Sequence, residues 1–117
     1  MGRVFVLVDG RNVQRSRWPN VSSEELVEAV AHWAADEGHE ALVVFDGSAP
    51  DGAVGTGGES ADDWIARHAA AHEGELWLVT SDRELRRRVG DRAARTTGGG
   101  GFLELLGLAS RRRGRGS

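Results

Sequence analysis

Three short runs of apolar residues occur within the first eighty positions of the chain. They are VFVLV at 4–8, ALVVF at 41–45 and LWLVT at 76–80. Each run is continuous rather than alternating, which is typical of a strand that other elements cover on both faces. We therefore predict three buried strands at these positions.

The segments between these runs carry apolar residues at helical spacing. We predict helices over residues 23–37, 61–72 and 83–89. Their inward-facing positions are Leu26, Val30, Trp33 and Ala34 in the first, Ile65 and Ala69 in the second, and Leu85 and Val89 in the third. Ser22 with Glu25, and Ser60 with Asp63, have the spacing of a capping box, which marks the start of the first two helices.

Strands that alternate with helices are typical of an α/β fold, in which helices cover both faces of a mostly parallel sheet. We expect a fourth strand over 91–96 and a last short helix over 102–108. The Gly-rich segments 47–58 and 96–101 predict a mobile binding loop and a flexible hinge. One domain would span residues 1–109, followed by a disordered Arg-rich tail over 110–117.

Composition excludes several classes of chemistry. The chain has no Cys, which excludes zinc–thiolate sites and a Cys nucleophile, and no Lys, which excludes a Schiff base and the phosphate-binding Lys of a P-loop. The net charge of −3 includes four Arg in the segment 111–117, so the rest of the chain is more acidic still. Such a body does not suit a protein that coats duplex nucleic acid. The chain has neither a membrane-length apolar run nor a signal-peptide pattern, so we expect a cytoplasmic protein.

Each predicted strand leads into an aspartate. Asp9 and Asp46 follow the first two strands directly, and Asp82 follows the third after one Ser. Taken singly, Asp9-Gly10 and Asp46-Gly47 have the composition of turns, and Asp82 that of a helix N-cap. Parallel strands, however, bring all three carboxylates to the carboxyl edge of the sheet, where open α/β sheets bind ligands.

Carboxylates that converge at one edge repel each other, and a divalent cation relieves that repulsion. Oxygen ligands without Cys or His favour Mg²⁺ or Mn²⁺ over zinc, and such ions suit phosphoryl chemistry. A further acidic group opens the helix at 61–72. Asp62 borders its core-facing stripe and is our candidate ligand, whereas Asp63 serves the capping box and Glu59 is a reserve ligand.

Four segments in this order resemble the NYN domains, a branch of the PIN-like nucleases. They are VLVDGRNV, VVFDG, SADDWIARHA and LWLVTSDREL. Within that group the chain is most similar to the YacP-like ribonucleases, over roughly residues 3–90. It departs from them at Arg11, where an aromatic residue is common, and in being shorter after residue 90.

The resemblance implies a Rossmann-like three-layer PIN/NYN fold and a metal-dependent endoribonuclease that leaves 5′-phosphate and 3′-hydroxyl ends. The metal-site acids of the family fall on Asp9, Asp62 and Asp82. Asp46 matches a less uniform acidic position. Asn12 matches the signature Asn, which would orient the attacking water or a phosphate.

Basic residues and an aromatic residue near the same edge predict contacts with RNA. We assign substrate phosphates to Arg11, Arg15, Arg83 and Arg86, with Ser81 beside them, and note that Trp18 lies in a loop where it would stack on a base. Alternatives stay open: an RNA-binding or ribosome-associated module without catalysis, or a PIN-type toxin of a toxin–antitoxin pair. The sequence also leaves open whether the chain forms a homodimer.

Other α/β families with acids at this edge fit less well. A receiver domain needs a Lys opposite its phosphorylated Asp, and a haloacid-dehalogenase phosphatase needs Asp-x-Asp where this chain has DGR. A dinucleotide-binding domain needs G-x-G-x-x-G after the first strand, and that motif is absent. A metal-dependent ribonuclease therefore remains the main hypothesis.

Overall fold

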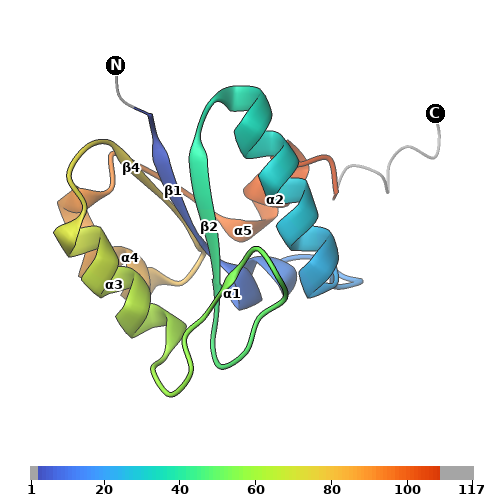
Figure 1. Ribbon diagram of the computed structural model, residues 1–117, viewed down its shortest axis with the longest axis horizontal. Coiled ribbons are helices and arrows are strands. Elements are labelled where there is room, and N and C mark those ends of the chain that lie inside the picture. Colours follow the sequence, from blue (N-terminus) through green and yellow to red (C-terminus); the bar gives the residue numbers. More distant parts are fainter. Residues whose placement is uncertain (1–2, 109–117) are drawn as a thin grey trace.

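The computed structural model describes residues 3–108, in which one sheet has helices on both faces (Figure 1). The strands are β1 (Phe5–Asp9), β2 (Glu40–Phe45), β3 (Val54–Gly55), β4 (Leu76–Val79) and β5 (Arg95–Thr97). Their order is β3-β2-β1-β4-β5, and all neighbouring pairs are parallel. The predicted α/β class is confirmed, and the first three predicted strands lie within one residue of β1, β2 and β4.

The helices are α1 (Gly10–Gln14), α2 (Ser23–Glu37), α3 (Ala61–Ala71), α4 (Arg83–Val89) and α5 (Gly99–Leu105). The Ser22 hydroxyl accepts a hydrogen bond from the Glu25 amide, and the Ser60 hydroxyl accepts one from the Asp63 amide, both at 3.0 Å. Both predicted helix starts are therefore confirmed.

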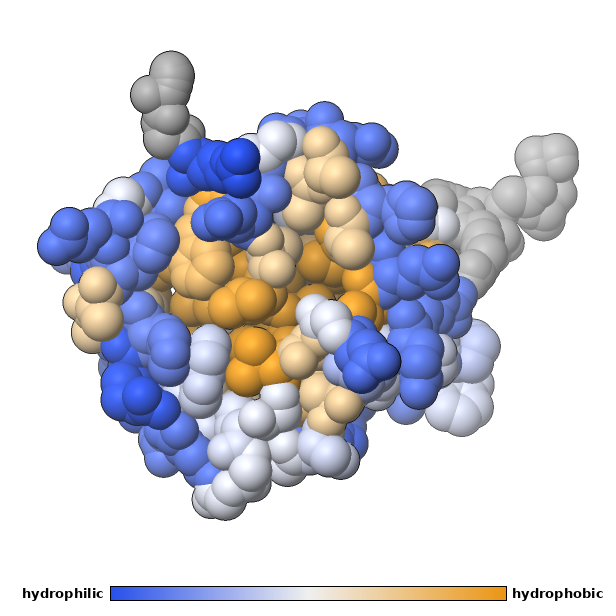
Figure 2. Space-filling model, in the orientation of Figure 1, coloured by the Kyte–Doolittle hydropathy of each residue, from blue (hydrophilic) through white to orange (hydrophobic). Residues whose placement is uncertain are grey.

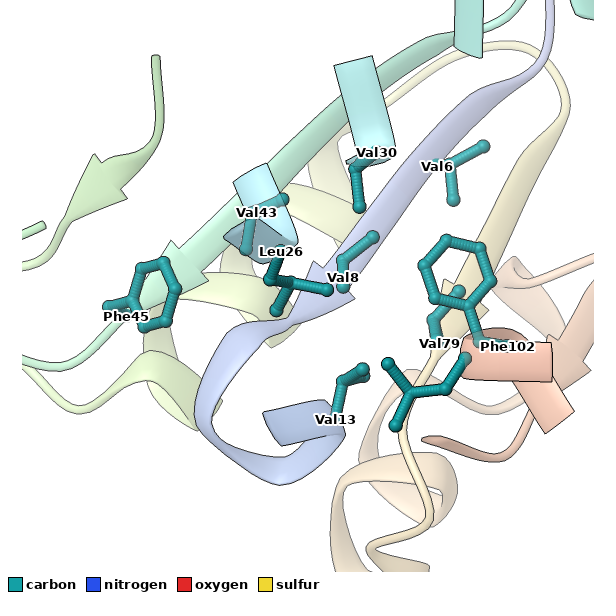
Figure 3. Packing of buried hydrophobic residues seen from close by; sticks show 10 residues of the cluster. Val6, Val8, Val13, Leu26, Val30, Val43, Phe45, Val79 and Phe102 are labelled. Carbon is teal, nitrogen blue, oxygen red and sulfur yellow. The ribbon is translucent and has the colours of Figure 1, made fainter. Parts of the chain in front are cut away.

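Alternate residues of each strand face opposite layers. Val6 and Val8 of β1 pack in one cluster with α1, α2 and α5, whereas Leu7 packs in another with α3 and α4. Figure 3 shows the first cluster, where Leu26 of α2 and Phe102 of α5 meet the strand residues. Burial on both faces explains why the strands read as unbroken apolar runs.

Asp9-Gly10 is not a simple turn, because α1 begins at Gly10, directly after β1. This close connection requires glycine: a Cβ at position 10 would lie 2.6 Å from a ring carbon of Phe45. The Asp-Gly pair therefore marks a helix packed tightly over the end of β2.

Both Gly-rich segments contain regular structure. The loop over 47–58 contains β3 and an antiparallel bridge between Gly47 and Gly57. The predicted hinge over 96–101 is wrong, because β5 continues to Thr97 and α5 begins at Gly99. A Cβ at Gly99 would collide with the Ser16 side chain, so this glycine allows α5 to approach α1. The predicted strand over 91–96 is wrong in its first half, because Gly90–Arg92 form a 3-10 helix and β5 begins at Arg95. The predicted helix over 102–108 begins three residues earlier, at Gly99, and ends at Leu105.

A shallow groove of about 440 Å³ runs between α2 and the first half of β2, and Ala34, Ala41 and Leu42 contribute to its lining. Figure 2 shows apolar residues gathered between α3 and α2, ringed by hydrophilic ones. The groove lies toward the amino edge of the sheet, away from the acids. Within residues 3–108, every helix is too short or too polar to traverse a lipid bilayer. The predicted disordered tail over 110–117 lies outside the described residues.

Candidate active site

The strand register brings the predicted acids to one edge of the sheet. Asp9 pairs with Val44 of β2, and Val8 pairs with Val79 of β4, so Thr80 is level with Asp9. Asp46 lies two residues after Val44, and Asp82 lies two residues after Thr80. All three acids therefore stand at the carboxyl ends of adjacent strands.

Asp46 connects this edge to α3. Its Oδ1 accepts a hydrogen bond from the Ala61 amide at 2.5 Å, which places the first turn of α3, and with it Asp62, next to the strand ends. Asp46 itself is exposed. The hydrogen bond that Asp46 accepts therefore positions the start of α3.

Asp9 is the buried member of the set, with 6% of its surface exposed. Its Oδ2 accepts a hydrogen bond from the Thr80 hydroxyl at 2.9 Å. Burial raises the pKa of Asp9 to about 6; repulsion from Asp62 and Asp82 adds to this, while the bond from Thr80 opposes it. The environment of Asp9 thus disfavours its negative charge.

Asp62 is partly buried and electrostatically coupled to the same group. Burial raises its pKa, with further repulsion from Asp82 and Asp46 and partial relief from Arg88. Asp63 differs: its amide serves the capping box, and its carboxylate binds Arg88 Nη1 at 2.8 Å. These contacts agree with the prediction that Asp63 belongs to the helix cap, whereas Asp62 is the candidate ligand.

The predicted reserve ligand, Glu59, has another partner. Its carboxylate forms an ion pair of 2.5 Å with Arg67 on α3. This pair and the one between Asp63 and Arg88 line a groove of about 550 Å³ between α3 and α4. The carboxylate of Glu59 is therefore already paired with an arginine.

Asp82 is the N-cap of α4, as one interpretation of the sequence held. Its Oδ1 accepts a hydrogen bond from the Glu84 amide at 2.9 Å. Its Oδ2 accepts none from residues 3–108. Capping therefore occupies one oxygen of Asp82 and leaves the other for a ligand.

Asn12 and Ser81 are held together across the site. Asn12 Oδ1 accepts a hydrogen bond from the Ser81 amide at 2.8 Å, and the Ser81 hydroxyl oxygen accepts one from the Gly99 amide at 2.9 Å. These bonds tie α1, the end of β4 and the start of α5 into one frame. Both side chains thus position the backbone of the site. The hydroxyl hydrogen of Ser81 is not used in these bonds and could be donated to a phosphate.

Thr80 is the site residue that the sequence interpretation missed. Its side chain is fully buried, and its hydroxyl both donates to Asp9 and accepts from the Asp82 amide at 3.1 Å. A polar residue that ends a buried apolar strand, immediately before Ser-Asp, is the signal that marks it. Thr80 links two of the predicted metal ligands.

The predicted phosphate-binding arginines fall into two groups. Arg11, Arg15 and Arg83 are exposed, and their side chains form no ion pair or hydrogen bond with residues 3–108. Arg86 is also exposed, but its Nε donates to the Thr80 carbonyl at 2.9 Å. The first three are available to an external anion, whereas Arg86 also braces the turn after β4.

The carboxylate oxygens at this edge are ligands of the kind that Mg²⁺ or Mn²⁺ prefers. Within residues 3–108, no three acidic, His or Cys side chains are grouped closely enough to hold an ion by themselves. Mg²⁺ usually keeps several waters and binds one or two carboxylates together with substrate phosphates. The electrostatically coupled carboxylates of Asp9, Asp62 and Asp82 would supply such ligands. The residues present therefore fit a hard cation that is partly hydrated.

The chain matches no family model and no curated protein. Among solved structures it is similar to Rae1 (YacP) from Bacillus subtilis. A mutant form superposes with a TM-score of 0.73 at 24% identity, over 95% of this chain and 79% of Rae1. The unmutated protein gives 0.69 at 22%, over 98% and 79%.

This chain has the fold of Rae1 (YacP). The likeness to Rae1 extends over nearly all of the chain, including the shorter part after residue 90. The resemblance to YacP-like proteins is thus confirmed at the level of the fold.

Proposed function

We propose that this protein is a metal-dependent endoribonuclease that hydrolyses RNA phosphodiester bonds with Mg²⁺ or Mn²⁺. One observation carries the proposal: Asp9 is buried beside Asp62 and Asp82, and their repulsion contributes to raising its pKa to about 6. A divalent cation removes that penalty by compensating the charges. The Rae1-like fold and the resemblance to NYN ribonucleases support the same reaction class.

Asp9, Asp62 and Asp82 would hold the ion. Bound there, it would supply a water of lowered pKa and stabilise the charge that develops on the phosphate. Thr80 fixes the carboxylate of Asp9 through its hydroxyl, and Asp46 fixes the start of α3 near Asp62. These two contacts limit how far the acids can move apart.

The other polar residues of this edge would handle the substrate. Asn12 holds the Ser81 backbone at the end of β4, and the Ser81 hydroxyl would donate to a phosphate. Arg11, Arg15 and Arg83 are available to phosphates on either side of the scissile bond. The net result is an acidic centre flanked by cations, the charge pattern that a metal-dependent nuclease needs.

Single-stranded RNA, incubated with Mn²⁺ or with EDTA, tests the proposal. Asp9→Asn, Asp62→Asn and Asp82→Asn should each reduce cleavage by at least about a hundredfold, equivalent to ~3 kcal/mol of transition-state stabilisation. Asn remains a good N-cap, so the change at position 82 removes charge while keeping α4 capped. Asp63→Asn is the matched control and should cleave at the wild-type rate.

Calorimetric titration with Mn²⁺ provides a second measurement. The wild-type protein should bind the ion, and the Asp9→Asn protein should bind it at least tenfold more weakly. A protein that neither binds Mn²⁺ nor cleaves RNA would refute the proposal.

One observation favours a second candidate, RNA binding without catalysis. Within residues 3–108 no three acidic, His or Cys side chains are grouped so that they could hold a metal ion, and Asp82 caps α4. Crosslinking to RNA separates the two functions. An RNA-binding module would crosslink equally well after Asp9→Asn and Asp82→Asn and would show no Mn²⁺-dependent cleavage.

A further inference from the structure

The loop over residues 15–22 lies at the same edge of the sheet as the acids. It follows α1, which begins directly after Asp9, and leads into the N-terminus of α2 (Figure 1). A rise of ~1.5 Å per helical residue and at most ~3.6 Å per extended residue keep Trp18 within about 22 Å of Asp9. A nucleic acid bound at Asp9 thus passes within reach of this loop.

Several polar contacts hold the loop in place. Gln14 Nε2 donates to the Val21 carbonyl at 2.9 Å and to the Ser23 hydroxyl at 3.2 Å. Arg17 forms an ion pair of 2.8 Å with Glu104 on α5. The loop is therefore braced against both α2 and α5.

Trp18 projects from this braced loop with 83% of its surface exposed. The other tryptophans, Trp33, Trp64 and Trp77, are partly buried and pack against the hydrophobic clusters. Within residues 3–108, Leu105 is the only other large hydrophobic residue that is exposed. A large aromatic ring on a fixed support is the arrangement that base stacking requires.

The charges around Trp18 favour a polyanion over a protein surface. Arg11 and Arg15 precede it on the same segment, and both are exposed, with no ion pair to residues 3–108. In an acidic chain, cations free of a carboxylate partner are positioned for phosphates. Arg17 is already neutralised by Glu104 and serves the loop itself.

We propose that Trp18 stacks on an unpaired base of the substrate RNA while Arg15 and Arg11 contact the adjoining phosphates. The inference rests on the proposed function in that its ligand is the RNA. It adds that the substrate has a single-stranded nucleotide a short distance from the cleaved bond. Stacking accepts every base, so this contact selects unpaired structure rather than sequence.

Binding of a fluorescein-labelled 12-nucleotide RNA, followed by anisotropy in EDTA, tests the inference without cleavage. Trp18→Ala should weaken binding at least about fivefold. Trp18→Phe, which keeps a ring, should restore most of the affinity. Leu105→Ala is the matched control, because it removes the other exposed apolar side chain, and it should bind as the wild type does.

A fully paired RNA of the same length should lose no more than twofold in affinity through Trp18→Ala. Equal affinities of the wild-type and Trp18→Ala proteins for single-stranded RNA would overturn the inference, and the ring would then belong to a protein contact. A loss that is the same for paired RNA would overturn it too. Mn²⁺-dependent cleavage, measured separately, tests the proposed function, so the two can fail independently.

Discussion

Thr80 donates a hydrogen bond from its buried hydroxyl to Asp9 Oδ2 across a distance of 2.9 Å, although 71 positions separate the two residues. The same hydroxyl accepts the Asp82 amide at 3.1 Å. One buried oxygen thus joins the end of β1 to the turn that begins α4. A single Thr hydroxyl thus contacts two of the candidate metal ligands.

Replacement of Thr80 by Val should destabilise the protein by about 1–3 kcal/mol at pH 8, because a buried carboxylate loses its donor. The loss should be smaller at pH 5, where Asp9 is protonated. Urea unfolding at the two pH values measures the difference. Thr80→Ser keeps the hydroxyl and should recover most of the stability; a serine variant as unstable as the valine variant would point to packing instead.

The raised pKa of Asp9 predicts a stability that falls with pH when metal is absent. Below 3.8, the ordinary value, the carboxyl is protonated in the folded and the unfolded chain. Between pH 3.8 and about 6 the unfolded chain has released its proton while the folded chain still holds it, so the stability of the folded state falls by roughly 3 kcal/mol over this range. Asp9→Asn should remove this decline.

Thermal unfolding in EDTA between pH 4 and pH 8 measures the effect. Addition of Mn²⁺ at pH 8 should raise the melting temperature of the wild-type protein and leave that of Asp9→Asn nearly unchanged. Asp63→Asn, whose exposed carboxylate pairs with Arg88, is the control and should behave as wild type. Parallel pH profiles for the wild type and Asp9→Asn would contradict the interpretation of Asp9.

Gly10→Ala should destabilise the fold by about 1–3 kcal/mol, because the added methyl group would overlap the buried ring of Phe45. Gly58→Ala is a matched control, since a Cβ there meets nothing within 4 Å. Denaturant unfolding of both variants gives the comparison. If the two variants prove equally stable, the close contact between α1 and β2 is looser than described.

Arg15→Ala should lower the salt dependence of RNA binding. One lost phosphate contact reduces the slope of log K against log salt by about 0.7 for a single strand. Arg3→Ala is the control, because Arg3 pairs with Glu40 at the opposite edge of the sheet. Affinity measured from low to moderate salt checks the slope; an unchanged slope for Arg15→Ala would place the RNA elsewhere.

Local patterns determined much of this protein. The apolar runs predicted β1, β2 and β4, and the Ser22 and Ser60 capping boxes predicted where α2 and α3 begin. The order of strands and helices then implied a parallel sheet and placed Asp9, Asp46 and Asp82 at one edge. These features depend on residues near one another in the chain, or on a general rule of α/β topology.

Tertiary structure alone decided the rest. The role of Thr80 depends on the register between β1 and β4, which no local pattern encodes. Gly99 reads as part of a flexible hinge in the sequence, yet it begins α5, and Ser16 lies so close to it that only glycine fits there. Packing between distant segments sets such contacts, and the same packing buries Asp9 and gives its carboxylate a raised pKa.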